Sequence, residues 1–116
     1  MRRRDTVPAR LDAESAEQIA RTLQALSAPS RLRILSELRH RPSTVGDLTE
    51  ALGLEQSAVS HQLRLLRMMG LVTSSRSGRH VTYALHDDHV AALLDEAVHH
   101  AEHVRLGKVD GVPGPA

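Results

Sequence analysis

The segment from residue 43 to residue 85 constrains the fold most, because its helical stretches are short and each is closed by a glycine. Apolar residues at helical spacing predict a first short helix that Ser43 caps and Gly53 ends. After a tight turn, the same spacing predicts a second helix from about Gln56 to Met69, which Gly70 ends. Two helices joined so closely are typical of a helix-turn-helix, whose second helix lies in the DNA major groove.

A β-hairpin is predicted directly after the second helix. Residues 71–75 form its first strand, Arg-Ser-Gly-Arg at 76–79 forms its tip, and Val81, Tyr83 and Leu85 alternate along its return strand. A hairpin in this position is the wing of a winged helix-turn-helix. Its two arginines can contact the DNA backbone or enter the minor groove.

Three further helices are predicted around this unit. Helical spacing predicts a first helix from Ala13 to about Leu26 and a last helix from about Asp88 to Val104. Pro29 suits the first turn of a second helix, with Ser27 or Ser30 near its cap. The fold class is therefore mainly α, with a small β component that the hairpin supplies.

Length and composition bound the rest of the chain. At 116 residues there is room for one domain, expected at 13–106 between a flexible arm at 1–12 and a flexible tail at 107–116. The lack of cysteine excludes disulfides and thiolate metal sites, and no apolar run is long enough to span a bilayer. A cytoplasmic protein without a membrane partner is therefore expected. The net charge of +1 does not by itself indicate a nucleic-acid partner.

The predicted reading helix carries a polar stripe. This stripe lies opposite the apolar Val59 and Leu63. Its members, at i, i+3, i+4 and i+7, are Ser57, Ser60, His61 and Arg64. Small hydroxyls let a helix enter the major groove, and an arginine can reach a phosphate or a guanine edge. The candidate contacts to double-stranded operator DNA are Gln56, Ser57, Ser60, His61, Gln62 and Arg64, with Arg76 and Arg79 on the wing. For the stripe alone, an ordinary solvated helix face is the alternative.

Histidine is concentrated near the last predicted helix, where five of the eight histidines lie between His86 and His103. On a helix, His89, His100 and His103 fall within a narrow sector, because eleven residues are close to three full turns. The apolar residues beside this line are Val90, Leu94, Ala97 and Ala101. The line of histidines therefore borders a surface suited to a partner.

Because of the helical rise, the candidate ligands on one helix lie too far apart to hold a single metal ion. His89 and His100 lie roughly 16 Å apart along the axis, whereas zinc–nitrogen bonds are about 2 Å. In an antiparallel pair of these helices, the start of one meets the end of the other. A homodimer then has two identical sites, each with Asp87 and His89 from one chain and His100 and His103 from the other. Three nitrogens and one oxygen suit Zn(II) or Co(II), whereas Ni(II) or copper needs added ligands.

One other class of protein remains as an alternative to a metal sensor. In a metal-independent winged-helix repressor, the histidines are ordinary surface residues. A metal-dependent hydrolase needs a nucleophile or a general base beside an open coordination position, and nothing in the sequence resembles either. The chain is therefore expected to be neither an enzyme nor a binder of small organic substrates.

Three motifs carry a resemblance to a known family. They are Leu26-Ser27-Ala28-Pro29-Ser30-Arg31-Leu32, Gln56-Ser57-Ala58-Val59-Ser60-His61-Gln62-Leu63, and Asp87-x-His89 with His100-x-x-His103. Through them, residues 14–106 closely resemble the ArsR/SmtB family of metal-sensing repressors. The resemblance implies a winged-helix dimer built on the first and last helices. It also implies that the apo form represses an efflux or sequestration operon and that metal binding weakens its hold on DNA.

The resemblance also bears on the metal. It implies the family's site on the last helix, with the four ligands named above, and a hydrogen bond from His100 to the carbonyl of Gly70 that relays metal binding. Thr44-Val45-Gly46-Asp47 stands where other members have the Cys-x-Cys of an arsenic, cadmium or lead site. The chain looks most like the nickel/cobalt sensors but lacks their N-terminal Gly-His and later C-terminal histidines. A four-ligand zinc or cobalt site is therefore expected, with nickel/cobalt sensing as the alternative.

Overall fold

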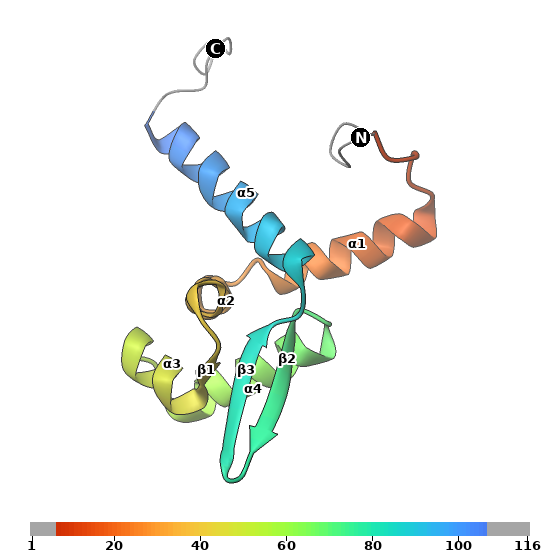
Figure 1. Ribbon diagram of the computed structural model, residues 1–116. Coiled ribbons are helices and arrows are strands. Elements are labelled where there is room, and N and C mark those ends of the chain that lie inside the picture. The colour runs from red at the N-terminus through yellow and green to blue at the C-terminus, as the bar shows by residue number, and fades with distance from the viewer. Residues whose placement is uncertain (1–6, 107–116) are drawn as a thin grey trace.

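The computed structural model describes residues 7–106. This part of the chain forms five helices and three strands (Figure 1). In chain order they are α1 (Ala13–Ala25), α2 (Pro29–His40), β1 (Ser43–Thr44), α3 (Val45–Leu52), α4 (Gln56–Met68), β2 (Val72–Ser77), β3 (His80–Leu85) and α5 (Asp88–Arg105). The predicted winged helix-turn-helix, mainly α with a small sheet, is confirmed. Residues 1–6 of the predicted arm and the whole predicted tail at 107–116 lie outside the described residues.

Glycines end both helices of the helix-turn-helix, as predicted. Gly53 caps α3 with a φ of 68°, and Gly70 follows α4 with a φ of 75°. In this left-handed region a side chain is strained, so glycine is the natural residue at both points.

The cap at the start of α3 was predicted one residue too early. Thr44 is the N-cap, because its Oγ1 accepts from the N–H of Asp47 at 3.0 Å while Asp47 Oδ2 accepts from the N–H of Thr44 at 3.0 Å. Ser43 is buried instead, and its hydroxyl donates to the carbonyl of Arg41 at 3.2 Å. The reciprocal capping box of Thr44 and Asp47 satisfies two backbone N–H groups. A cap at Ser43 would not make this pair of hydrogen bonds.

The second helix also begins differently from the prediction. Pro29 occupies its first turn, as expected, but the N-cap is Ala28, whose side chain makes no capping hydrogen bond. Ser27 belongs to the end of α1, since its hydroxyl donates to the carbonyl of Gln24 at 2.7 Å. The fixed φ of proline suits the first turn of a helix without a polar cap.

The sheet has one more strand than the predicted hairpin. Its order is β1-β3-β2, with both pairs antiparallel, and β1 pairs Ser43 with Tyr83 and Thr44 with Thr82. The hairpin is longer than predicted, since its last pair joins Ser77 to His80 and leaves Gly78 at the turn with a φ of 63°. The predicted alternation along β3 is also absent, because residues 81–85 are all half-buried in a strand with neighbours on both edges.

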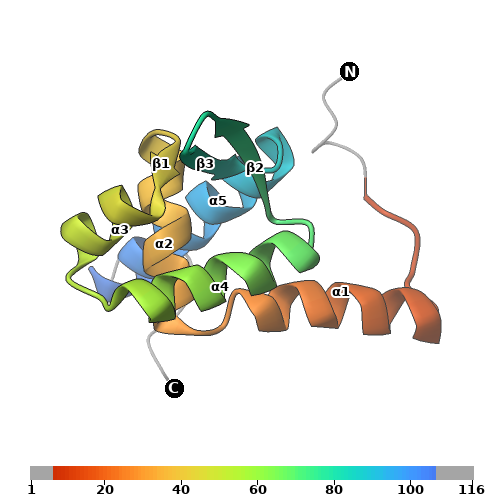
Figure 2. The ribbon, with the colours of Figure 1, turned by 90° about the horizontal axis from the view of Figure 1, so that it is seen from below.

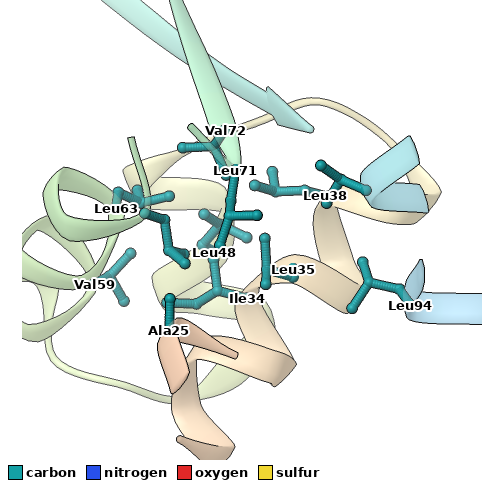
Figure 3. Packing of buried hydrophobic residues seen from close by; sticks show 12 residues of the cluster. Ala25, Ile34, Leu35, Leu38, Leu48, Val59, Leu63, Leu71, Val72 and Leu94 are labelled. Atoms are coloured by element: carbon teal, nitrogen blue, oxygen red, sulfur yellow. The ribbon is translucent and has the colours of Figure 1, made fainter. Parts of the chain in front are cut away.

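One apolar core joins the helix-turn-helix to the sheet (Figure 3). Its completely buried side chains are Ile34, Leu35, Leu48, Val59, Leu63, Leu66 and Val72. They come from α2, α3, α4 and β2, so these elements form one packed unit. In contrast, α1 contributes only Ala25 and α5 contributes Val90 and Leu94. No helix within residues 7–106 is long and apolar enough to cross a membrane.

Candidate nucleic-acid interface and metal half-sites

The polar stripe of α4 faces away from the core. Ser57, His61 and Arg64 are exposed and Ser60 is half-buried, whereas the opposite face, which includes Val59 and Leu63, is buried. Helix α4 lies at the same end of the molecule as α3 and the β2–β3 hairpin, while α1 and α5 diverge from the other side (Figure 1). The predicted reading residues thus lie on a surface that a DNA duplex can reach.

The wing places its two arginines beyond the helices. Arg76 pairs with Val81 in the hairpin ladder and Arg79 is part of the turn, and both side chains are exposed. The hairpin projects furthest from α1 and α5 (Figure 1). This arrangement suits a basic wing that contacts the duplex beside the reading helix.

Two glutamines predicted to contact DNA differ in their surroundings. Gln56 is exposed in the first turn of α4. Gln62 is half-buried, and its Oε1 accepts a hydrogen bond from Nε of Arg31 in α2 at 2.9 Å. Gln62 therefore already has a partner inside the protein.

Asp87 divides its two carboxylate oxygens between the helix and the surface. Its Oδ1 accepts from the N–H of Val90 at 3.1 Å and so caps α5. Its Oδ2 lies 3.2 Å from Nδ1 of His86 and 3.7 Å from Nδ1 of His89. The hydrogen bond from Val90, followed by that with His86, lowers the pKa of Asp87. Asp87 is therefore a carboxylate at neutral pH, as a metal ligand must be.

The four predicted ligands form two pairs at opposite ends of α5. We call Asp87 and His89 the N-terminal half-site, and His100 and His103 the C-terminal half-site. All four residues are exposed, and the His89 side chain is 80% accessible. Among residues 7–106 no three histidine or acidic side chains are arranged to hold an ion. Within one protomer, the structure thus does not bring the four predicted ligands together, in agreement with the helical rise.

His86 is closer to the N-terminal half-site than the sequence suggested. The four predicted ligands do not include His86, but its Nδ1 lies closer to Oδ2 of Asp87 than Nδ1 of His89 does. Its position directly before the capping residue was the available signal. A predicted helical sector could not reveal this contact, because His86 precedes the helix.

The relay from His100 to Gly70 stays a prediction. His100 is exposed near the end of α5, and the side-chain hydrogen bonds within residues 7–106 include none from its ring to Gly70. Helix α4 ends just before Gly70, as predicted, and the N–H of Leu71 donates to the carbonyl of Leu66 at 2.9 Å across this end.

The apolar residues of α5 lie in two different surroundings. Val90 and Leu94 are buried within the protomer, whereas Ala97 and Ala101 line a groove of about 520 Å³ between α2 and α5. Val98 also lines this groove and is 51% exposed. On α1, Ile19 and Leu23 are 43% and 51% exposed. Large apolar side chains therefore remain accessible on the two helices predicted to form the dimer.

Comparison with known proteins identifies relatives over almost the whole chain. Residues 28–74 match the family model described as bacterial regulatory protein, arsR family. The chain is 57% identical over 112 residues to the HTH-type transcriptional regulator NmtR of Mycobacterium tuberculosis, covering 97% of this chain and 92% of that protein. It is 42% identical to a transcriptional repressor SmtB homolog of Synechocystis over 85% of this chain and 75% of that one.

Solved structures agree with these relatives. The solution structure of apo-NmtR has a TM-score of 0.73 at 54% identity and covers 100% of this chain and 98% of its own. A homodimeric winged helix-turn-helix DNA-binding domain from Mycobacterium bovis has a TM-score of 0.73 at 28% identity, covering 84% and 92% of the two chains.

Proposed function

The chain belongs to the ArsR family of bacterial regulatory proteins, and on that premise we propose that it is a homodimeric, metal-responsive transcriptional repressor of the cytoplasm. The apo dimer binds operator DNA, and an ion bound between the subunits weakens that binding. One observation carries this proposal: α5 presents four ligand-type side chains as two half-sites that a single helix cannot join. A homodimeric relative of the same fold supports the dimer.

DNA binding is assigned to α4 and the wing. The exposed face of α4 supplies hydroxyls, an imidazole and a guanidinium for base edges and phosphates, and the wing supplies two arginines. The residues assigned to DNA are Gln56, Ser57, Ser60, His61, Arg64, Arg76 and Arg79. Because the net charge is only +1, two reading heads are needed for strong binding.

The metal site is assigned to the N-terminal half-site of one subunit and the C-terminal half-site of the other. The donor set of one carboxylate and three imidazoles, without sulfur, fits Zn(II) or Co(II). A bound ion supplies charge and fixed ligand directions that hold the two α5 helices together. If His100 held the ion through one ring nitrogen, its other nitrogen would carry the proton and could donate to the carbonyl of Gly70.

Nickel/cobalt sensing is the second candidate, and His86 is the observation that favours it. Ni(II) and octahedral Co(II) need more than four ligands. His86 lies against Asp87, so the described part of the chain offers one further imidazole beside the N-terminal half-site. The absorption spectrum of the Co(II) form separates the two candidates, because tetrahedral sites absorb far more strongly than octahedral sites.

The test is operator binding measured by fluorescence anisotropy, using a labelled duplex selected from a random pool with the native chain. We expect zinc or cobalt to weaken binding by about tenfold or more, which corresponds to a coupling free energy above roughly 1.4 kcal/mol. His100→Ala removes this response, whereas His99→Ala, its neighbour outside the four ligands, keeps it. Operator affinity that is unchanged by zinc, cobalt and nickel would contradict metal sensing and leave a metal-independent repressor.

A further inference from the structure

Arg31 joins three helices through two hydrogen bonds. The side chain lies in α2 and is half-buried. Its Nη1 donates to the carbonyl of Ala25, the last residue of α1, at 2.9 Å, and its Nε donates to Oε1 of Gln62 in α4 at 2.9 Å. The carbonyl of Ala25 is among the last carbonyls of α1, which have no partner within their own helix. One guanidinium therefore connects the end of α1 to the side of α4.

This connection lies where α1 has little other support. Ala25 is the only buried residue of α1, and the helix extends past the other helices in both views of the molecule (Figures 1 and 2). The direction of α1 relative to the core thus depends on its last residues and on the groups that hold them. Arg31 holds one of these residues directly.

Gln62 lies at the edge of the reading face. It follows His61 directly, so it is turned about 100° around the helix from that residue. It lies toward α2, as the hydrogen bond from Arg31 shows. An amide whose oxygen is engaged in this way is poorly suited to the bidentate reading of adenine, which uses both the oxygen and the nitrogen.

We propose that Arg31 and Gln62 are positioning residues that fix the angle between α1 and α4. The inference rests on the proposed function, in which α1 belongs to the dimer interface and α4 reads DNA. A planar guanidinium donates in two fixed directions, so it can serve a carbonyl and an amide at once. The link thereby makes the direction of the reading helix depend on how the two subunits are joined.

The test is a double-mutant cycle in operator affinity, at protein concentrations where the dimer is complete. Arg31→Met removes both hydrogen bonds and Gln62→Leu removes the one between the two side chains. Each is expected to weaken operator binding by roughly tenfold, because holding α4 at its angle then costs about the net free energy of a lost hydrogen bond. The double variant is expected to bind about as weakly as Arg31→Met alone, because Gln62 has no hydrogen bond from α2 left to lose once Arg31 is replaced. Arg21→Met, on the face of α1 opposite Ile19 and Leu23, is the control for charge loss and is expected to bind normally.

Two further readouts separate positioning from direct DNA contact. Arg31→Met is expected to leave the salt dependence of operator binding unchanged, whereas the loss of a phosphate contact lowers the slope by about one. Arg31→Lys is expected to show most of the loss, since an ammonium lacks the fixed fork. It also serves as the gentler variant if thermal unfolding shows that Arg31→Met is not folded.

The outcomes are distinct. Native affinity in Arg31→Lys and Gln62→Leu, or a loss of about a hundredfold in the double variant, would overturn the positioning role. A reduced salt slope in Arg31→Met would also overturn it, by making Arg31 a phosphate contact. If the native chain selects no duplex from the random pool, the proposed function fails instead.

Discussion

The strongest prediction concerns which subunit supplies each ligand. Two variants are prepared: one lacks the N-terminal half-site (Asp87→Ala with His89→Ala) and the other lacks the C-terminal half-site (His100→Ala with His103→Ala). Neither homodimer has a complete site, so neither is expected to bind zinc tightly. When the two variants are mixed under conditions that exchange subunits, tight zinc binding is expected to return.

The magnitude follows from the geometry of α5. Two ligands on one tetrahedral zinc lie about 3.4 Å apart, whereas eleven helical residues separate the half-sites by roughly 16 Å. Sites can therefore form only between subunits. Random exchange makes about half of the dimers mixed, and each mixed dimer has one intact site and one that lacks all four ligands. The mixture should bind about one quarter of the zinc that the native protein binds.

Calorimetric titration of the mixture measures this recovered fraction, and a competing chelator makes the titration specific for tight sites. The matched control is a mixture of the native chain with His99→Ala, which should bind zinc fully. Tight binding by either variant alone would refute the intersubunit site. So would a mixture that binds no zinc although mass spectrometry shows mixed dimers.

Four further predictions follow from other contacts. Asp87→Asn should lower zinc affinity but keep the unfolding temperature of the apo protein nearly unchanged, because an amide oxygen can still accept from the N–H of the capped turn. Arg79→Ala should weaken operator binding at all sequences and lower its salt slope by about one, as measured by anisotropy. Leu35→Ala, at a completely buried position, should destabilise the fold by about 3 kcal/mol in denaturant unfolding. The hydrogen-bonded ion pair with Arg39 lowers the pKa of Asp95. The stability that this pair contributes is therefore present above the usual aspartate pKa and is lost as the pH falls through the lowered value. Arg39→Met should remove this part of the acid dependence of the unfolding free energy.

The sequence predicted the helix-turn-helix well because local chemistry determines it. Gly53 and Gly70 end their helices in a conformation that other residues rarely adopt, so their positions can be found without tertiary information. Strand β1 was missed because two residues carry no periodicity and because its pairing with β3 spans about forty residues of chain. The cap at Thr44 was misplaced for a related reason, since burial of Ser43 in that strand decides between two adjacent hydroxyl residues.

The candidate metal site was predictable in its residue types but not in its neighbours. Helical spacing and rise predicted two separated pairs of ligands, and the four residues lie near the two ends of α5. The contact of His86 with Asp87 depends on the extended backbone before the helix, which no helical pattern describes. In the same way, the hydrogen bond that Gln62 accepts comes from Arg31, 31 residues away in α2, so no local pattern along α4 could reveal it.

Thr44 has a wider consequence, because it is both the last residue of β1 and the N-cap of α3. The wing is thereby connected to the helix-turn-helix through the sheet, and both belong to the unit that the buried core joins. In the proposed dimer, the fit to an operator then depends on the distance and the angle between the two winged helix-turn-helix units. Its half-sites can vary in sequence more freely than in spacing, because one inserted base pair turns one half-site by about 34° relative to the other.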